Sequence, residues 1–258
     1  MKEKHPKSEI VVPKGTLFVT GGSHGIGRAI VERVRERYQE VFNFDRSSSA
    51  SMDVRDSDEL KKAMAGSLMG EKTQNDLVVS AGVIVAKSFL NQTPAEISFQ
   101  IGTNLEGAIL TIQSFLKWHE QNDQTKTKPN IVVISSVSAN LHEHSDVAVY
   151  EASKAGLSHF VRSLADPGRG EFVINVVEPG TIRNTKIGGW TPENEYNHDA
   201  REAIEEAQMR EVESVGVEVT PDDVAETVEQ LLFSNNRGIF NGAVFTVDGG
   251  YSVLKPKL

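Results

Sequence analysis

Short apolar runs that alternate with amphipathic segments constrain the fold of this chain more than any other feature of its sequence. Their β-branched composition is typical of strands that are buried on both faces of a parallel sheet. Six runs are expected to be strands: Thr16–Thr20, Val41–Phe44, Leu77–Ser80, Ile131–Ser135, Phe172–Val177 and Ala243–Val247. Because helical patterns separate these runs, we predict an α/β fold, a doubly wound parallel sheet with helices on both faces.

Helix signals fill the segments between the runs. Ile26, Ile30 and Val34 recur every four residues after the first run, as on the apolar face of a helix. Thr93-Pro94-Ala95-Glu96 has the pattern of a capping box with proline at the first helical position. Thr220-Pro221-Asp222-Asp223 opens a second helix in the same way.

The length of 258 residues suits one domain with a full-sized core, and no linker rich in Pro, Gly or Ser divides it. We therefore expect a single domain over residues 15–258. Residues 1–14 are charged and lack the apolar stretch of a signal peptide, so we expect them to form a flexible tail. Residues 184–216 are polar and interrupt the alternation of strands and helices. We expect them to form a flap that covers a substrate site.

Charge and composition argue against several kinds of partner. The formal net charge of −9 disfavours binding to nucleic acid or to an anionic membrane surface. No apolar run approaches the ~20 residues of a membrane span. The absence of cysteine excludes disulfides and thiolate metal sites, and it fits a cytoplasmic protein. The expected partner is a small-molecule substrate.

A glycine-rich loop follows the first expected strand and leads into the first expected helix. Glycines allow a tight turn and close approach to a pyrophosphate, while a helix N-terminus offers free N–H groups and the positive end of the dipole. The spacing is G-x-x-x-G-x-G rather than the more common G-x-G-x-x-G. The loop predicts a dinucleotide site, in which His24 either touches a phosphate or is an exposed loop residue. The residues expected to bind the cofactor here are Gly21, Ser23, His24, Gly25, Ile26 and Gly27.

Acidic residues after the next strands bear on the choice of cofactor. Asp45 ends the second expected strand, where a carboxylate can bind both ribose hydroxyls and repel a 2′-phosphate. This favours NAD, although the adjacent Arg46 can favour a phosphate and Asp45 is alternatively a solvated turn residue. Asp53, after the next short strand, is expected to bind the adenine amino group, with Val54 contributing its backbone. Alternatively, Asp53 is a carboxylate at a helix start.

Tyr150 and Lys154 are four positions apart, which places both side chains on one face of a helix. The ordinary pKa of a phenol, about 10, is too high for a base at neutral pH. A nearby ammonium favours the phenolate, so the pair can act as a general acid/base. Many surface helices carry such a pair without function, and the surrounding motifs give this one its meaning.

Eight motifs occur in a fixed order: the glycine loop, Asp53-Val54, Ala81-Gly82, Asn104-Leu105-Glu106-Gly107, Ile134-Ser135-Ser136, Tyr150 with Lys154, Pro179-Gly180 with Thr185, and Val247-Asp248-Gly249-Gly250. In this order they resemble the short-chain dehydrogenase/reductase family, from Thr16 to about Tyr251. The resemblance implies a Rossmann-type fold, an NAD(P)-dependent oxidoreductase and a homo-oligomer, a tetramer or a dimer. The assembly would use the helices that carry Asn104 and Tyr150, together with the C-terminal segment.

The resemblance also implies roles for individual residues. Tyr150 would exchange a proton with the substrate oxygen, Ser136 would hydrogen-bond that oxygen, and Lys154 would hold the nicotinamide ribose. Asn104 would bend its helix and position a water that links Lys154 to solvent. The implied catalytic residues are therefore Asn104, Ser136, Tyr150 and Lys154. The further cofactor-binding residues are Ala81, Gly82, Asn104, Tyr150, Lys154, Pro179, Gly180, Ile182 and Thr185.

The chain departs from the family pattern at two places. Ser80 precedes Ala81-Gly82 where the family usually has asparagine. The family's catalytic serine typically lies thirteen residues before the tyrosine, where this chain has Val137. One extra residue in the loop would make Ser136 the catalytic serine, and Ser138 is the alternative.

We therefore expect an NAD-dependent oxidoreductase that interconverts a secondary alcohol and its ketone, with Tyr150 as general acid/base. The alternatives are an NADPH-dependent carbonyl reductase and a non-catalytic NAD-binding regulator. Substrate contacts are expected from Ser136 and Tyr150, and also from His142, His144 and Trp190. The two histidines suggest a metal site, but no third ligand is indicated, so no metal is expected. The polar loops favour a small hydroxylated substrate, and its identity stays open.

Overall fold

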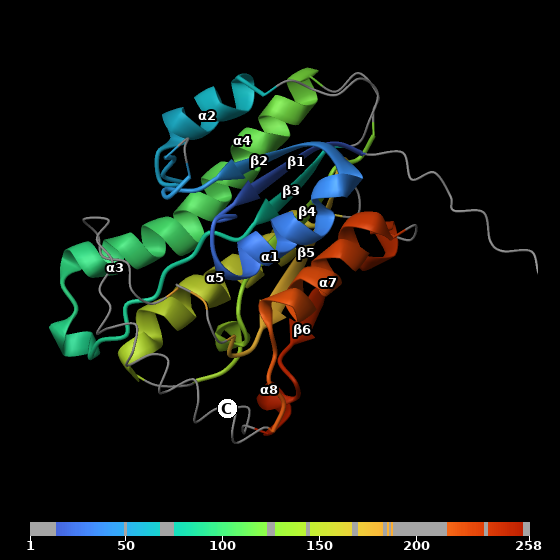
Figure 1. Cartoon of the computed structure of the whole chain (residues 1–258). Coiled ribbons are helices and arrows are strands. Elements are labelled where there is room, and N and C mark those ends of the chain that lie inside the picture. The colour runs from blue at the N-terminus through green and yellow to red at the C-terminus, as the bar shows by residue number, and fades with distance from the viewer. Residues whose placement is uncertain are drawn as a thin grey trace, which may run out of the picture.

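The computed structural model describes residues 14–48, 51–67, 75–122, 127–142, 145–166, 170–182, 185, 187, 216–234 and 237–254. Six strands of these residues form one parallel sheet in the order β2-β1-β3-β4-β5-β6 (Figure 1). They are β1 (Lys14–Thr20), β2 (Tyr38–Phe44), β3 (Asp76–Val79), β4 (Asn130–Ile134), β5 (Val173–Pro179) and β6 (Val244–Val247). Each overlaps one predicted strand, and the predicted parallel sheet is confirmed.

Two differences from the predicted strands have local causes. β2 begins at Tyr38 rather than Val41, because it pairs with β1 from Lys14 onward and the Tyr38 hydroxyl donates to the buried Asp76 carboxylate at 2.6 Å. The short strand predicted before Asp53 is wrong. Ser51 has a positive φ of 30°, and the N–H of Met52 turns back to the carbonyl oxygen of Asp45 at 3.2 Å.

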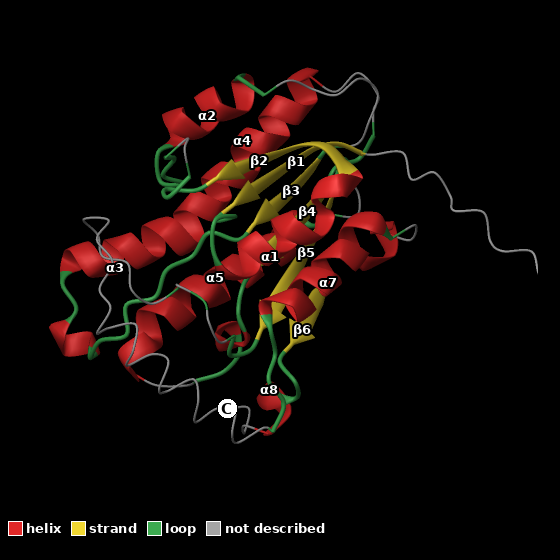
Figure 2. Ribbon diagram, viewed as in Figure 1, coloured by secondary structure: helices red, strands yellow, loops and turns green. Residues whose placement is uncertain are grey.

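Helices cover both faces of the sheet, as predicted (Figure 2). The helices are α1 (Gly25–Val34), α2 (Ser57–Ala65), α3 (Pro94–Ile101), α4 (Gly107–Asn122), α5 (Ala148–Leu164), α7 (Pro221–Phe233) and α8 (Tyr251–Leu254). α1 and α7 pack on one face, and α2, α4 and α5 pack on the other. Alternation along β1 builds both cores, because Leu17 and Val19 point to the first face and Phe18 to the second.

Both predicted capping boxes are confirmed. The Thr93 hydroxyl accepts a hydrogen bond from the N–H of Glu96 at 3.2 Å, and the Glu96 carboxylate accepts from the N–H of Thr93 at 2.7 Å. Thr220 and Asp223 form the same reciprocal pair at the start of α7. These caps fix where α3 and α7 begin. Among the residues that the structure describes, no helix combines the length and apolar character needed to cross a membrane.

Candidate active site

The candidate site lies at the carboxyl ends of the strands. Because the strands are parallel, these ends meet at one edge of the sheet, and the strand order reverses between β1 and β3. The glycine loop follows β1, Asp45 follows β2, Ser80 follows β3 and Ser136 lies two residues after β4. The topology therefore gathers at one edge the motifs that are spread over more than 100 residues of sequence.

The glycine loop requires glycine at two positions. Gly21 has a φ of +70°, and a Cβ atom there would lie 2.8 Å from the backbone of Ala81. A Cβ atom on Gly27 would lie 2.2 Å from the carbonyl oxygen of Gly21. The loop backbone thus packs closely against the start of α1, whose free N–H groups favour an anion. This arrangement fits the pyrophosphate of a dinucleotide cofactor. Ile26 packs into the core beneath the loop.

Asn43 on β2 fastens this loop, and the sequence reasoning missed it. Its Oδ1 accepts a hydrogen bond from the N–H of Gly22 at 2.9 Å, and its Nδ2 donates to the Ser23 hydroxyl at 3.0 Å. A polar residue one position before the end of an apolar strand was the available signal. Asn43 orients the loop through neutral hydrogen bonds.

Asp45 lies directly beside the glycine loop. Its Oδ2 accepts from the N–H of Ser23 at 3.2 Å, and its Oδ1 accepts from the N–H and the hydroxyl of Ser47 at 2.8 and 2.6 Å. His24 forms the N-terminal cap position of α1, and its Nδ1 lies 3.4 Å from the Ser47 hydroxyl. The carboxylate therefore places a negative charge next to the loop that fits the pyrophosphate.

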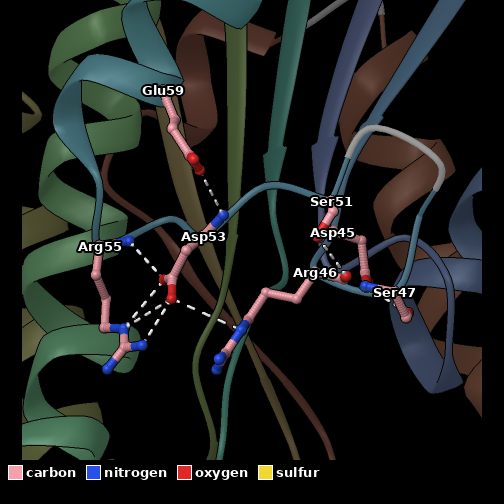
Figure 3. Close-up of polar contacts among 7 residues, drawn as sticks. All are labelled: Asp45, Arg46, Ser47, Ser51, Asp53, Arg55 and Glu59. Carbon is pink, nitrogen blue, oxygen red and sulfur yellow. Dashed lines mark hydrogen bonds and ion pairs between the residues drawn. The ribbon is translucent and has the colours of Figure 1, made fainter. Parts of the chain in front are cut away.

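Asp53 is held between two arginines, which approach its carboxylate from opposite sides (Figure 3). Arg55 donates from Nη2 at 2.6 Å and from Nε at 3.0 and 3.1 Å, and the Arg46 Nε lies 3.6 Å away. Burial favours a higher pKa for Asp53, but the hydrogen bonds and charge of Arg55, with the charge of Arg46, outweigh it and lower that pKa. Both guanidinium groups also lie over the Phe99 ring. Sequence reasoning missed Arg55. The available signal was a cation two residues after Asp53. Val54 is buried and packs against Gly107 of α4.

Asn104 sits in the π-helical turn η3 (Gly102–Glu106), which joins α3 to α4. Its Oδ1 accepts from the N–H of Val83 at 2.8 Å, while its Nδ2 donates to the Val83 carbonyl oxygen at 2.8 Å and to the Ser153 hydroxyl at 3.0 Å. The side chain is completely buried. The turn is a local widening of the helix.

Lys154 and Asn104 meet at Gly82. A Cβ atom on Gly82 would lie 3.4 Å from the Lys154 Nζ and 3.5 Å from the Asn104 Oδ1. The Lys154 Nζ donates to the Ile134 carbonyl oxygen at 3.0 Å and lies 5.8 Å from the centre of the Tyr150 ring. Burial lowers the pKa of Lys154 to about 8. Both residues of the Tyr150–Lys154 pair lie on the buried face of α5.

Three serines after β4 have different surroundings. The hydroxyl of Ser136 lies 2.9 Å from that of Ser138 and accepts from the N–H of Ser138 at 3.1 Å. Ser136 caps the short turn η4 (Val137–Ala139). The Ser135 hydroxyl points instead toward α5, at 3.1 Å from the Lys154 carbonyl oxygen. Ser136 and Ser138 therefore belong to one hydrogen-bonded pair, and both remain candidates.

The segment after β5 returns to the glycine loop. The backbone N–H of Gly180 donates to Val247 on β6 at 2.9 Å, and a Cβ atom on Gly180 would lie 2.8 Å from the Asp248 Cβ. Ile182 is buried and forms a parallel bridge with Val219. The Thr185 side chain is buried, and the position of a Cβ atom on Gly25 lies 3.2 Å from it. Pro179 ends β5, and Thr185 lies beside Gly25 at the start of α1.

The predicted substrate contacts are only partly visible. His142 is exposed, and its Nδ1 lies 3.5 Å from the Glu151 carboxylate. His144 and Trp190 lie outside the described residues, as do most of the predicted flap and residues 1–13 of the predicted tail. Within the described ranges, no group of three or more His, Asp or Glu side chains is placed to hold a metal ion.

Comparison with known proteins places this geometry among oxidoreductases. A family model described as enoyl-(acyl carrier protein) reductase matches residues 21–252. The 3-oxoacyl-[acyl-carrier-protein] reductase MabA of Mycobacterium bovis is 28% identical over 243 residues, which cover 91% of this chain and 92% of that protein. A short-chain dehydrogenase/reductase oxidoreductase from Burkholderia thailandensis is 26% identical with a TM-score of 0.73, and the match covers 94% of both chains. The ligand-free aldohexose dehydrogenase of Thermoplasma acidophilum has the same fold, with a TM-score of 0.77 and 24% identity over 95% of this chain and 96% of that one.

Proposed function

Because the chain belongs to the short-chain dehydrogenase/reductase family of oxidoreductases, we propose that it interconverts a secondary alcohol and its ketone with NAD(H). The observation that carries the proposal is the buried Lys154 ammonium, 5.8 Å from the centre of the Tyr150 ring on the same face of α5. At neutral pH, which lies below the pKa of about 8, this ammonium is mainly charged. A buried charge beside a phenol strongly stabilises the phenolate.

The chain's own residues then divide the chemistry. In the oxidation direction, the Tyr150 phenolate takes the hydroxyl proton of the alcohol, and in reduction the phenol returns it. A serine of the Ser136–Ser138 pair hydrogen-bonds the substrate oxygen. A bound nicotinamide would supply the hydride acceptor for oxidation of the carbinol carbon and the hydride donor for reduction of the carbonyl carbon. Asn104 keeps the π-helical turn open, and a water held there would link Lys154 to solvent.

The same edge of the sheet would hold the cofactor. The glycine loop and the N-terminus of α1 would take the pyrophosphate, and Asp45 the adenosine ribose. Asp53 and Val54 would lie at the adenine, Ala81 and Gly82 at the adenosine ribose, and Lys154 at the nicotinamide ribose. Ile182 and Thr185 would bind the carboxamide. Two close approaches support this assignment: a Cβ atom on Gly82 would lie 3.4 Å from the Lys154 Nζ, and a Cβ atom on Gly25 would lie 3.2 Å from the Thr185 Cβ.

Asp45 supports NAD as the cofactor. Its carboxylate is anchored to the loop at Ser23, so a 2′-phosphate at this position would face a fixed negative charge. The NADPH-dependent carbonyl reductase is the second candidate, because Arg46 and Arg55 bring two cations to the neighbouring Asp53. Similar proteins include both reductases and a dehydrogenase, so they leave the direction open. We favour alcohol oxidation, because an NAD-selective site suits it.

The function is tested by measuring NAD and NADP reduction against a panel of polyols, cyclic diols and hydroxysteroids, with the corresponding ketones in reverse. We expect turnover with NAD and a shift toward NADP in Asp45→Ala. A preference for NADP in the wild type that Arg46→Ala removes would establish the second candidate instead. Cofactor binding without turnover on any member of the panel would favour a regulator without catalysis. Ser136→Ala and Ser138→Ala, measured side by side, identify the catalytic serine by the larger loss of kcat.

We also propose a single domain with a substrate flap at about residues 184–216, a cytoplasmic location and a homo-oligomer. β6 ends the described sheet, and Ile239, Val253 and Leu254 near it are 78, 80 and 66% exposed. An edge strand beside exposed apolar side chains supports assembly at the C-terminal segment. Sedimentation of the wild type and of Val253→Asp tests this: a monomeric wild type would contradict the proposal. Limited proteolysis tests the flap, and cell fractionation tests the location.

A further inference from the structure

Glu178 on β5 is a buried carboxyl group for which the proposed chemistry has no use. Its side chain is 2% exposed, although it lies directly before Pro179 in the segment that leads to the active site. It forms no ion pair with any residue that the structure describes. An ionised carboxylate that is buried without a paired cation is costly, and such groups usually become neutral instead.

Three hydroxyl contacts connect Glu178 to the catalytic helix. The Glu178 Oε1 lies 2.8 Å from the Ser158 hydroxyl on α5, and the Ser158 hydroxyl lies 2.8 Å from that of Ser135. The Ser135 hydroxyl in turn lies 3.1 Å from the carbonyl oxygen of Lys154. On its other side, the Glu178 Oε2 accepts from the Asn140 Nδ2 at 2.7 Å. The carboxyl group therefore bridges α5 and the loop after β4.

The number of protons in this series of hydrogen bonds distinguishes the ionised form of Glu178 from the protonated form. A serine hydroxyl has one proton to donate, and an ionised carboxylate has none. If Glu178 is ionised, Ser158 must donate to it, and the single proton of Ser135 can serve the contact with Ser158 or the contact with the Lys154 carbonyl oxygen, but not both. One of these three contacts is therefore left without a proton.

A protonated Glu178 satisfies every contact. In that form the Oε1–H would donate to Ser158 across their 2.8 Å contact, which frees the Ser158 proton for Ser135 and the Ser135 proton for the carbonyl oxygen of Lys154. The remaining oxygen, Oε2, is the carbonyl of the acid and accepts from Asn140. All four contacts then contain one proton each, and all run in one direction.

We propose that Glu178 is protonated in the folded protein at neutral pH and that, as a neutral acid, it positions the catalytic serine turn against α5. Ser136 caps the start of η4 and Asn140 caps its end, so the bond from Asn140 to Glu178 fixes the far end of the turn. The other oxygen fixes Ser158, one helical turn after Lys154. Glu178 thus holds in register two elements, one carrying the serine pair and the other carrying Tyr150 and Lys154.

The electrostatic surroundings agree with the proton count. Burial raises the pKa of Glu178, against the opposing effects of the Ser158 hydrogen bond, the charge of Arg162 and the Asn140 hydrogen bond. Arg162 lies one helical turn after Ser158 on α5 and is exposed. Lys154, one turn before Ser158, directs its ammonium to the Ile134 carbonyl instead. From β6, the neighbouring strand, the uncharged Thr246 is the residue in register with Glu178.

Protonation of Glu178 predicts the direction in which the free energy of unfolding changes with pH. The folded pKa of Glu178 is raised above its unfolded value, so between the two values the folded chain binds the proton and the unfolded chain does not. This contribution to stability is present at low pH and is lost as pH rises toward the folded pKa. Glu178→Gln keeps a donor and an acceptor but cannot titrate. We expect E178Q to gain stability relative to the wild type as pH rises from about 5 to about 8.

The experiment is urea unfolding of wild type and E178Q over this pH range, with the exposed Glu120→Gln on α4 as the matched control. A midpoint difference that grows in favour of E178Q and exceeds the control's supports protonation. A difference that is flat, or that moves in favour of the wild type, overturns it. If E178Q does not fold, carbon-13 NMR of the wild type answers the question. A glutamate carboxyl carbon with the shift of the protonated acid at pH 7 supports the proposal, and its absence contradicts it.

The positioning role is tested by kcat, and this part rests on the proposed function. We expect E178Q to keep kcat within about twofold of wild type, because its amide reproduces both bonds. Glu178→Leu should lower kcat about tenfold or more with little change in cofactor affinity. Equal kcat values for the two variants would overturn the positioning role. The protonation test needs no turnover, so its failure is distinguishable from failure of the proposed function.

Discussion

The two halves of the candidate site are built from different kinds of polar contact. On the β2 side, Asp53, Arg46 and Arg55 form a charged cluster whose side chains remain 25–32% exposed. On the β4–β5 side, Asn104, Ser153 and Lys154 are at most 3% exposed; Asn104 donates to Ser153, and Lys154 donates to the Ile134 carbonyl oxygen. Water and salt screen the first set, whereas the second has no alternative partners. We infer that the first half tunes cofactor affinity, while the second determines turnover and stability.

Lys154→Met is expected to show the largest difference between the loss of kcat and the loss of cofactor affinity. It removes the buried ammonium beside Tyr150, so kcat should fall on the order of 10²- to 10⁴-fold, the range for general acid/base groups. Dissociation constants for the cofactor should change far less, since the variant loses one proposed contact to the nicotinamide ribose and keeps the glycine loop. Steady-state kinetics and fluorescence titration provide both numbers. An equal loss in affinity and kcat would contradict the inference that the two halves of the site have different roles.

The same variant makes a prediction about pH. Burial lowers the pKa of Lys154 from the 10.5 of an ordinary lysine to about 8. Between these values the unfolded chain binds the proton and the folded chain does not, so the stability of the wild type should rise with pH relative to Lys154→Met. The shift corresponds to a gain of about 3 kcal/mol across the window. Chemical unfolding at several pH values from 8 to 10 measures it, and a falling difference would contradict the buried lysine.

Asn104→Ala is expected to have the next largest effect. It leaves the N–H and carbonyl of Val83 and the hydroxyl of Ser153 without this partner inside the protein. The free energy of unfolding should fall by about 2–4 kcal/mol, because several buried groups lose hydrogen bonds. Gln113→Ala, an exposed change on α4, is the matched control and should lie within about 0.5 kcal/mol of wild type. Equal losses would show that the π-helical turn does not depend on Asn104.

Arg55→Ala should have the smallest effect. Its ion pair with Asp53 is partly exposed, so stability should change by no more than about 1 kcal/mol. Cofactor affinity should change by less than about tenfold, with kcat unaltered. Lys61→Ala, which breaks an exposed pair with Asp58, is the control. A large loss of kcat in Arg55→Ala would remove the distinction between the two halves.

The features that the sequence predicted well depend on local pattern or on chain order. The six strands followed from apolar runs, and the caps at Thr93 and Thr220 followed from residues three positions apart. The family assignment is confirmed by the match over residues 21–252. These signals need no knowledge of side-chain direction.

The missed contacts depend on which side chains converge after folding. Asn43 reaches a loop about 20 residues away, and the Asn104 amide meets Ser153 across two helices. Glu178 directly follows the predicted strand Phe172–Val177, and only the structure brings Ser158 and Asn140 to its two oxygens. Burial and hydrogen-bond partners arise from packing, which a single sequence does not specify residue by residue.

Tyr150→Phe tests the central claim most directly, because it removes one hydroxyl and leaves the ring on α5. The measurement is NAD affinity and turnover in the same protein preparation, on the substrate that the panel identifies. We predict a loss of kcat on the order of 10²- to 10⁴-fold with NAD affinity within a few-fold of wild type. Turnover close to that of the wild type would contradict the account of Tyr150 as the acid/base group.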